Sequence, residues 1–222
     1  MPMLNEIKIN KEGILLIDKP AGRSSFSIVA EVRRKLGVKK VGHAGTLDPF
    51  ATGLLIILVG KNFTRKAGEF LKLDKEYRAA INLSKISTTG DIEGEISEVK
   101  CLAPTIAQVK KALKQFVGEQ MQTPHIYSAV KIKGQPAYKL ARKGEKVSLL
   151  PKKITIYSID LVSYKHPELI IRVKVSSGTY IRVLAEDLGK ALHCGGYLTE
   201  LRRTTIGDYK VKDAVAVDQI GN

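Results

Sequence analysis

The segment 42–53, GHAGTLDPFATG, is the part of the sequence richest in residues that can do chemistry. Its glycines permit a tight, irregular backbone, Pro49 stiffens the exit, and Asp48 stands shortly before an apolar strand. An Asp-Pro step is commonly a turn starter. The alternative is a catalytic carboxylate, because loops that mix Gly, His, Thr and Asp at the mouth of an apolar strand often carry active residues.

A second candidate segment, 175–189, reads VSSGTYIRVLAEDLG and places Tyr180 and Arg182 at the start of an expected helix. The helix dipole slightly disfavours a cation at that end, so we expect an anionic partner for the Arg182 guanidinium. Either Asp48 or a phosphate would serve. The other interpretation is an ordinary surface arginine whose aliphatic stem packs on the protein.

The third candidate is Tyr77, in the stretch KEYR at 75–78 that opens an expected strand. A tyrosine in a strand usually serves half-buried packing. Its alternative role is a stacking platform for a base taken out of its helix.

Several other kinds of site are excluded by spacing. Gly60 and Lys61 follow an apolar strand, but Leu55 and Asn62 break the pattern of a phosphate-binding loop. The four histidines have no metal-ligand spacing with either cysteine. No nucleophilic Ser or Cys carries a recognisable local signature.

Strands and helices alternate irregularly around these candidates. Strands are expected over 13–18, 54–59, 76–83, 154–163 and 168–175. Three helices are expected. The first has a cap at Ser24 or Ser25 and a stop at Gly37, and the second has the capping-box pair Thr105 and Gln108 and a stop at Gly118. The third has an apolar face from Ile181 to Leu192. This mixed order favours an α+β fold with a mixed sheet over a doubly wound parallel one.

The chain has 222 residues, a formal net charge of +15 and 44% hydrophobic residues. A foldable chain with this surplus predicts a polyanionic partner, nucleic acid first and an anionic membrane second. The aliphatic run 54–59 is far too short to span a bilayer, and the first residues lack the features of a signal peptide. Cys101 and Cys194 form no Cys-x-x-Cys pattern, so we expect reduced thiols in a cytosolic protein.

The positive charge is concentrated between Lys131 and Lys153, where eight Lys or Arg residues face one acid, Glu145. Glycines and prolines in this stretch predict a long loop or hairpin. From the residues alone two interpretations stay open: a solvated charge run, and a loop that grips phosphates.

Six ordered blocks, running from Gly13 to about Val217, resemble the TruB family of tRNA pseudouridine synthases. The blocks are LLIDKPAGRSS at 15–25, GHAGTLDPFATGLL at 42–55, KEYRA at 75–79, PHIYSAVKIKGQPAYKLAR at 124–142, SGTYIRVLAEDLG at 177–189 and LRRTTIGDY at 201–209. Ser177 stands where many members have Cys, a difference that should not affect the chemistry.

The resemblance implies that uridine 55 in the T loop of tRNA is flipped out, cleaved from its ribose and rejoined through carbon as pseudouridine. Such an isomerisation needs no cofactor and no metal. Asp48, in the GTLDP motif, is the implied catalytic carboxylate, and Arg182 of the YIR motif is the implied cation that keeps it ionised against the effect of burial. Attack on the ribose, addition to the base and abstraction of a sugar proton all stay open as the role of Asp48.

The remaining site residues also follow from the resemblance. Tyr77 is expected to stack on the flipped base and to move the proton from the carbon that becomes the new glycosidic position. The implied substrate contacts are Tyr180 and Leu201 in the base pocket, His43 stacking in the space that the uridine vacates, and Lys19 with Pro20 supporting the pocket floor.

The implied architecture is the pseudouridine synthase fold: a central mixed, mostly antiparallel sheet flanked by helices and loops, in a single catalytic domain over 1–222. The basic stretch falls in the family's thumb-like insertion, about 123–152, so Lys139, Arg142 and Lys143 are expected to contact the T arm. The small C-terminal RNA-binding domain of the PUA type that is usual in the family is not expected in this chain.

We therefore expect a cytoplasmic monomer that acts on tRNA, with no membrane and no obligatory protein partner. Two alternatives stay open. One is a tRNA-folding helper that uses the same surface without turnover. The other is a guide-RNA-dependent enzyme of the dyskerin type, which needs protein partners.

Overall fold

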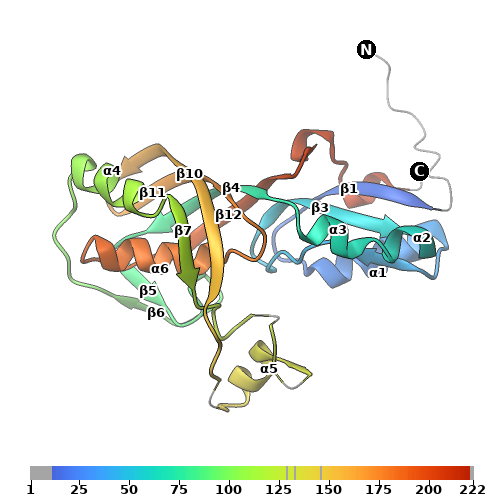
Figure 1. Ribbon diagram of the computed structural model, residues 1–222, viewed down its shortest axis with the longest axis horizontal. Helices are drawn as coiled ribbons and strands as arrows, with labels where there is room; N and C mark the ends of the chain where they lie inside the picture. The colour runs from blue at the N-terminus through green and yellow to red at the C-terminus, as the bar shows by residue number, and fades with distance from the viewer. Residues whose placement is uncertain (1–11, 129, 133, 146, 221–222) are drawn as a thin grey trace. The chain divides into compact units, whose positions relative to one another are not determined.

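The computed structural model describes residues 12–128, 130–132, 134–145 and 147–220, which form an α+β fold (Figure 1). The described chain separates into two compact units. The first takes its residues from Met1–Tyr77 and Leu201–Asn222, and the second is Arg78–Glu200. Strands β4 (Lys75–Asn82) and β12 (Tyr197–Ile206) each run from one unit into the other. The sequence predicts a single domain over 1–222 with an insertion at about 123–152. The division into two units does not test that prediction.

The sheet of the first unit is built around β3 (Thr52–Val59), whose side chains are nearly all buried. It pairs antiparallel with β1 (Gly13–Lys19) and β2 (Val41–His43), and parallel with the Arg202–Arg203 part of β12. The unit also contains α1 (Ser25–Leu36), α2 (Lys61–Thr64), α3 (Ala67–Leu71), β13 (Tyr209–Lys210) and the short 3₁₀ turns η1 (Val211–Asp213) and η2 (Val217–Gln219).

Helix α1 begins and ends where its sequence signals predict. The Ser24 hydroxyl accepts a hydrogen bond from the Ser27 N–H at 3.0 Å, which satisfies one of the free donors of the first turn. Gly37 ends the helix with φ 65°, a left-handed conformation that glycine adopts without steric cost. The buried face of α1 packs on the β1–β3 core through Ile28, Val29 and Val32.

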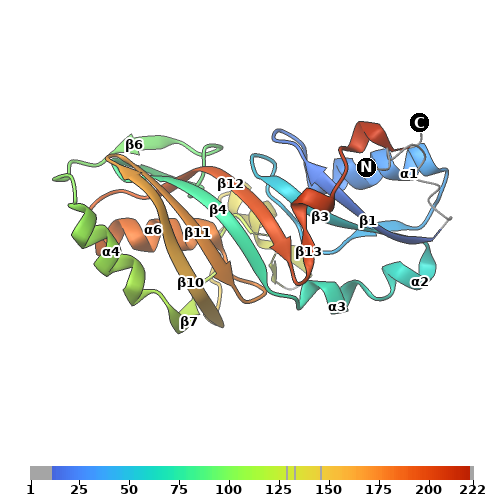
Figure 2. The same cartoon turned by 90° about the horizontal axis from the view of Figure 1, so that it is seen from above.

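The second unit has the strand order β12, β4, β11 (Glu168–Val175), β10 (Lys152–Lys165) and β7 (Gly118–Gln122). Helices α4 (Ile106–Gln115) and α6 (Ile181–Ala191) lie beside each other (Figures 1 and 2). The unit also holds the hairpin of β5 (Lys85–Ser87) and β6 (Ile96–Glu98), the two-residue strands β8 (Lys131–Ile132) and β9 (Gln135–Pro136), and α5 (Ala137–Arg142).

The expected fold class is confirmed, because the sheet is mixed: β10 is antiparallel to β7 and β11, and β3 is antiparallel to β1 but parallel to β12. All five expected strands and all three expected helices are present, with shifts of a few residues at their ends. The sequence patterns missed several elements, of which β12 is the longest. The basic stretch is a hairpin, as expected, followed by the unexpected helix α5.

The expectation of reduced cysteines is wrong. Cys101 and Cys194 are joined by a disulfide, with their Cα atoms 5.2 Å apart. That separation is within the range in which two cysteines can be bridged. Cys101 follows β6 and Cys194 follows α6, and a spacing of 93 positions along the chain does not reveal that the fold brings these two turns together.

No helix among the described residues is long and apolar enough to cross a membrane.

Candidate active site

Asp48 lies half-buried in the loop between β2 and β3, and side chains from three other elements hold this loop in place. The Ser25 hydroxyl, at the start of α1, donates to the Leu47 carbonyl at 3.0 Å and accepts from the Leu47 N–H at 2.9 Å. The Ala51 N–H closes a turn onto the Asp48 carbonyl at 3.1 Å. The backbone on both sides of the Asp48 carboxylate is therefore fixed.

Lys19 is a fully buried cation on one side of this loop. Its Nζ donates to the carbonyls of Pro49 at 3.1 Å, Pro20 at 2.8 Å and Arg23 at 2.6 Å. It thereby ties the residue directly after Asp48 to the end of β1. That Lys19 supports the floor of a substrate pocket stays a prediction.

Arg203 is the second buried cation at the loop, and sequence reasoning missed it. Its guanidinium comes from β12 and donates to the Leu54 carbonyl at 2.8 Å, the Gly45 carbonyl at 3.0 Å and the Thr46 carbonyl at 3.4 Å. Only 1% of Arg203 is exposed. The planar fork of an arginine suits such multiple contacts. Sequence reasoning missed Arg203 together with β12, the strand that carries it.

Gly53 shows why the motif needs glycine at the start of β3. Its φ is 101°, and a Cβ there would stand 2.3 Å from the Arg203 carbonyl oxygen. Any other residue would therefore push β12 away from β3 and take the Arg203 side chain with it.

The other predicted residues of the first unit lie on its strands. Tyr77 on β4 and Leu201 on β12 are buried. His43 on β2 is half-buried, and its Nδ1 is a buried atom with no hydrogen-bond partner among the described residues. Burial, and secondarily the Arg203 charge, lowers the pKa of His43, so its ring is neutral at pH 7. A neutral imidazole suits stacking on a base.

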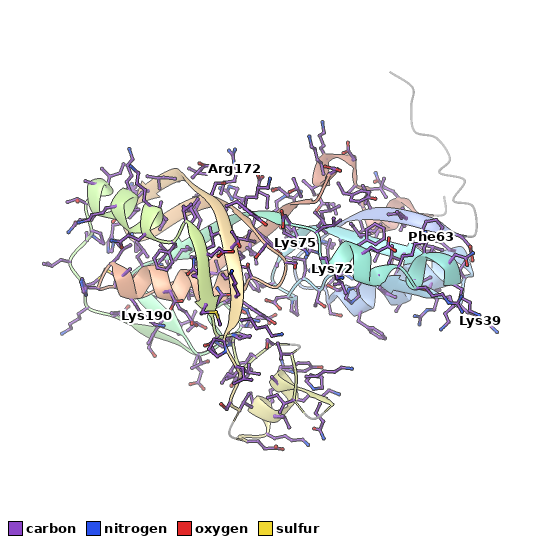
Figure 3. The ribbon with its side chains drawn as sticks, viewed as in Figure 1. Lys39, Phe63, Lys72, Lys75, Arg172 and Lys190 are labelled. Atoms are coloured by element: carbon purple, nitrogen blue, oxygen red, sulfur yellow. A yellow bond between two sulfur atoms is a disulfide. The ribbon has the colours of Figure 1, made fainter. Side chains whose placement is uncertain are left out.

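Lys75 opens β4, two residues before Tyr77, and is buried (Figure 3). Its Nζ donates to the carbonyls of Leu71 at 2.7 Å and Leu73 at 2.6 Å. Burial is the largest cause that lowers the pKa of Lys75 to about 8, and the charge of Arg203 adds to it. Lys75 therefore fixes the chain that leads into β4.

In the second unit, Arg182 is buried at the start of α6 and has an anionic partner, as its position predicts. Its Nη1 lies 3.4 Å from Oδ2 of Asp91, a residue that sequence reasoning missed. Arg182 also donates to the carbonyls of Thr89 and Tyr127, each at 2.9 Å. Asp91 in turn accepts from the Thr89 hydroxyl at 2.6 Å and the Glu93 N–H at 2.9 Å. The guanidinium is thus held in one orientation by fixed acceptors.

Tyr180 precedes α6, and Gln122 on β7 holds its backbone. The Gln122 amide accepts from the Tyr180 N–H at 2.8 Å and donates to the Tyr180 carbonyl at 3.1 Å. Because the side chain of Tyr180 provides no cap for α6, this two-way pairing anchors the first turn.

The basic residues Lys139, Arg142 and Lys143 are exposed on or just after α5. The Arg142 guanidinium lies over the Tyr138 ring, 5.8 Å from its centroid. In the described parts of the chain, no group of three or more His, Cys, Asp or Glu residues could hold a metal ion.

Comparisons with known proteins identify the family of the chain. Residues 33–181 match the family described as TruB family pseudouridylate synthase (N terminal domain), and residues 182–222 match the tRNA pseudouridylate synthase B C-terminal domain. The tRNA pseudouridine synthase B of Protochlamydia amoebophila is 47% identical over 204 residues, which cover 92% of this chain and 78% of the relative. The protein of the same name from Opitutus terrae is 44% identical over 211 residues, covering 94% and 87%.

Among solved structures, a chain of a Cbf5-Nop10-Gar1 complex matches with a TM-score of 0.73 and 29% identity, over 94% of this chain and 54% of that one. A chain of an H/ACA RNP bound to a substrate RNA containing 2′-deoxyuridine matches with a TM-score of 0.70 and 26% identity, over 93% and 51%. This protein spans about half the length of those chains. With a family match over most of its length and relatives at this level of identity, the chain belongs to the TruB family of pseudouridylate synthases.

Proposed function

We propose that the protein is a tRNA pseudouridine synthase that isomerises uridine 55 in the T loop, with Asp48 as the catalytic carboxylate. The bond between ribose C1′ and base N1 breaks, and a bond between C1′ and C5 forms. The proton on C5 leaves and N1 gains one, so the composition of the RNA does not change. The relatives named tRNA pseudouridine synthase B support this assignment.

The observation that carries the proposal is the way in which the Asp48 loop is held. Two buried cations, Lys19 and Arg203, donate to carbonyls on both sides of Asp48. A carboxylate that must meet a reacting atom gains from such fixed placement, because no reorganisation is needed during the reaction.

The other roles follow the same chemistry. Tyr77 stacks on the flipped base and moves the C5 proton, and Arg182 is the third catalytic residue. His43, Tyr180 and Leu201 receive the extruded nucleotide, and Lys139, Arg142 and Lys143 bind phosphates of the T arm. The protein works without cofactor as a cytoplasmic monomer. Size-exclusion chromatography with and without tRNA tests this oligomeric state.

The decisive experiment uses tRNA labelled with tritium on carbon 5 of uracil. The wild-type protein should release label from the tRNA, and not from a tRNA in which uridine 55 is replaced by cytidine. Asp48→Asn keeps the size of the side chain but removes the charge, so label release should stop while tRNA binding survives. Turnover by Asp48→Asn would refute the catalytic role, and a wild-type protein without label release would refute the function.

One alternative is favoured by a specific observation, the likeness to chains from a Cbf5-Nop10-Gar1 complex and from an H/ACA RNP. A protein of that kind would require partners and a guide RNA. Label release by the purified chain on a T-arm stem-loop alone would exclude this requirement, whereas activity only after adding such partners would establish it.

A further inference from the structure

One stretch of the first unit carries a positive charge that the proposed site does not use. Residues 32–68 hold eight Lys or Arg and a single acid, Asp48. Seven of the eight cations are exposed, and together we call them the β3-end basic patch: Arg33, Arg34, Lys39, Lys40, Lys61, Arg65 and Lys66.

The fold brings these seven residues together from three segments. The register of β2 on β3 places Val41 opposite Val59, so Lys40 and Lys61 both flank this end of the pair. The Gly60 N–H donates to the Lys40 carbonyl at 2.7 Å, and the Arg33 guanidinium donates to the Val41 carbonyl at 3.2 Å. The end of α1, the 38–40 loop and α2 therefore meet at the carboxyl end of β3.

Of the acids nearest to the patch, Glu69 is exposed three residues after Lys66, and two others have partners. Glu31 pairs with Arg23 at 2.6 Å, and the Glu12 carboxylate accepts from the Asn62 amide at 2.7 Å. Lys35, the eighth cation, donates to the carbonyls of Asp218 and Ile220 and is not part of the patch. The side chain of Lys39 projects outward from its loop (Figure 3). A surface with this excess of one sign attracts a polyanion.

The patch and Asp48 lie at opposite ends of β3. The Asp48 loop leads into Thr52, and the patch begins after Val59. At a rise of about 3.3 Å per residue, β3 separates the two by roughly 23 Å. RNA bound at the patch is therefore remote from the flipped nucleotide.

We propose that the β3-end basic patch binds phosphates of the tRNA beyond the T loop, as a second RNA contact remote from Asp48. This proposal rests on the proposed function for the identity of the RNA. The patch adds affinity through charge and takes no part in chemistry, because it lies at the end of β3 remote from Asp48.

The test compares two triple variants that remove the same charge. Lys39→Gln/Lys40→Gln/Lys61→Gln neutralises part of the patch, and Lys110→Gln/Lys111→Gln/Lys114→Gln neutralises three exposed lysines of α4. Dissociation constants are measured for full-length tRNA and for an isolated T-arm stem-loop over a series of salt concentrations. Thermal melting of both variants shows that they fold.

The patch variant should bind tRNA at least tenfold more weakly at low salt, with a slope of log affinity against log salt smaller by about 2. Its affinity for the stem-loop should change less than twofold, and label release at saturating tRNA should be unchanged. The α4 variant should match the wild type. Equal weakening by both variants, an equal loss on the stem-loop, or unchanged tRNA binding would each overturn the proposal. Because binding is measured apart from turnover, a failure of the proposed function would show only in label release.

Discussion

At the residue scale, the Asp48 loop depends on cations that donate to backbone carbonyls. Lys19 and Arg203 are both buried, yet between them they contact six carbonyl oxygens. A buried charge is tolerated only when it is paired or well hydrogen-bonded. The loop therefore stabilises the cations, and the cations in turn fix the loop.

Arg203→Lys should lower kcat at least tenfold, with a change in KM for tRNA of less than about threefold. A lysine keeps the charge but lacks the fork that reaches the Gly45, Thr46 and Leu54 carbonyls, so the Asp48 loop loosens while RNA contacts remain. Steady-state kinetics by label release provides the measurement.

The matched control is Arg202→Lys, because the neighbouring Arg202 is half-buried and forms an ion pair with Asp18 at 2.6 Å. Partly exposed pairs of this kind contribute about 1 kcal/mol or less. Similar kinetics for the two variants, or a loss that lies wholly in KM, would contradict the positioning role of Arg203.

Lys75 should make stability depend on pH. Its pKa of about 8 in the folded protein lies below the ordinary 10.5, so the unfolded chain holds the proton more tightly. Between these two values unfolding takes up a proton, and stability therefore rises with pH in that window. Relative to Lys75→Met, the wild type should gain stability from about pH 8 to about pH 10.5, as measured by urea unfolding. A difference between the two proteins that is independent of pH would show that Lys75 does not titrate there.

At the scale of elements, local sequence signals predicted the three main helices correctly but did not predict every strand of the sheet. Thr105 and Gln108 form a complete capping box at the start of α4, as their spacing predicts. Strand β12 has no clean alternation, because Arg203 is buried on it for its contacts to the Asp48 loop. A pattern that treats arginine as a solvent-facing residue cannot find such a strand.

Helix α5 presents the cations that were expected to bind the T arm. Neutralising Lys139, Arg142 and Lys143 with glutamine should weaken tRNA binding about tenfold and flatten its salt dependence, because these residues are exposed. Lys146, in the same basic stretch, is a further candidate phosphate contact and lies outside the described residues. Filter binding over a salt series is the measurement, with the α4 triple variant as the control. An unchanged slope of log affinity against log salt would show that the cations of α5 are only a solvated charge run and do not bind phosphates.

At the scale of the whole molecule, two compact units share β4 and β12, and a disulfide closes a long loop within the second unit. The loop between Cys101 and Cys194 spans 93 positions. Cross-linking residues so far apart restricts the unfolded chain strongly, which stabilises the folded state.

Reduction of this disulfide should lower the free energy of unfolding by about 2–4 kcal/mol. Urea unfolding of the wild type with and without a thiol reductant measures the change. The variant Cys101→Ala/Cys194→Ala serves as the control, and its stability should not respond to reductant. A wild type that unfolds identically under both conditions would show that the bond does not contribute.

The sequence by itself determined the family blocks, the fold class, both ends of α1, the start of α4, and the candidate residues Asp48, Tyr77 and Arg182. These features depend on local patterns: caps, apolar periodicity and short motifs. Only the tertiary structure decided that Arg203 and Lys19 hold the Asp48 loop, that Asp91 pairs with Arg182, and that Cys101 meets Cys194. Those contacts join residues far apart in the chain, and no local pattern encodes which distant backbone carbonyl or thiol the fold will bring within bonding distance.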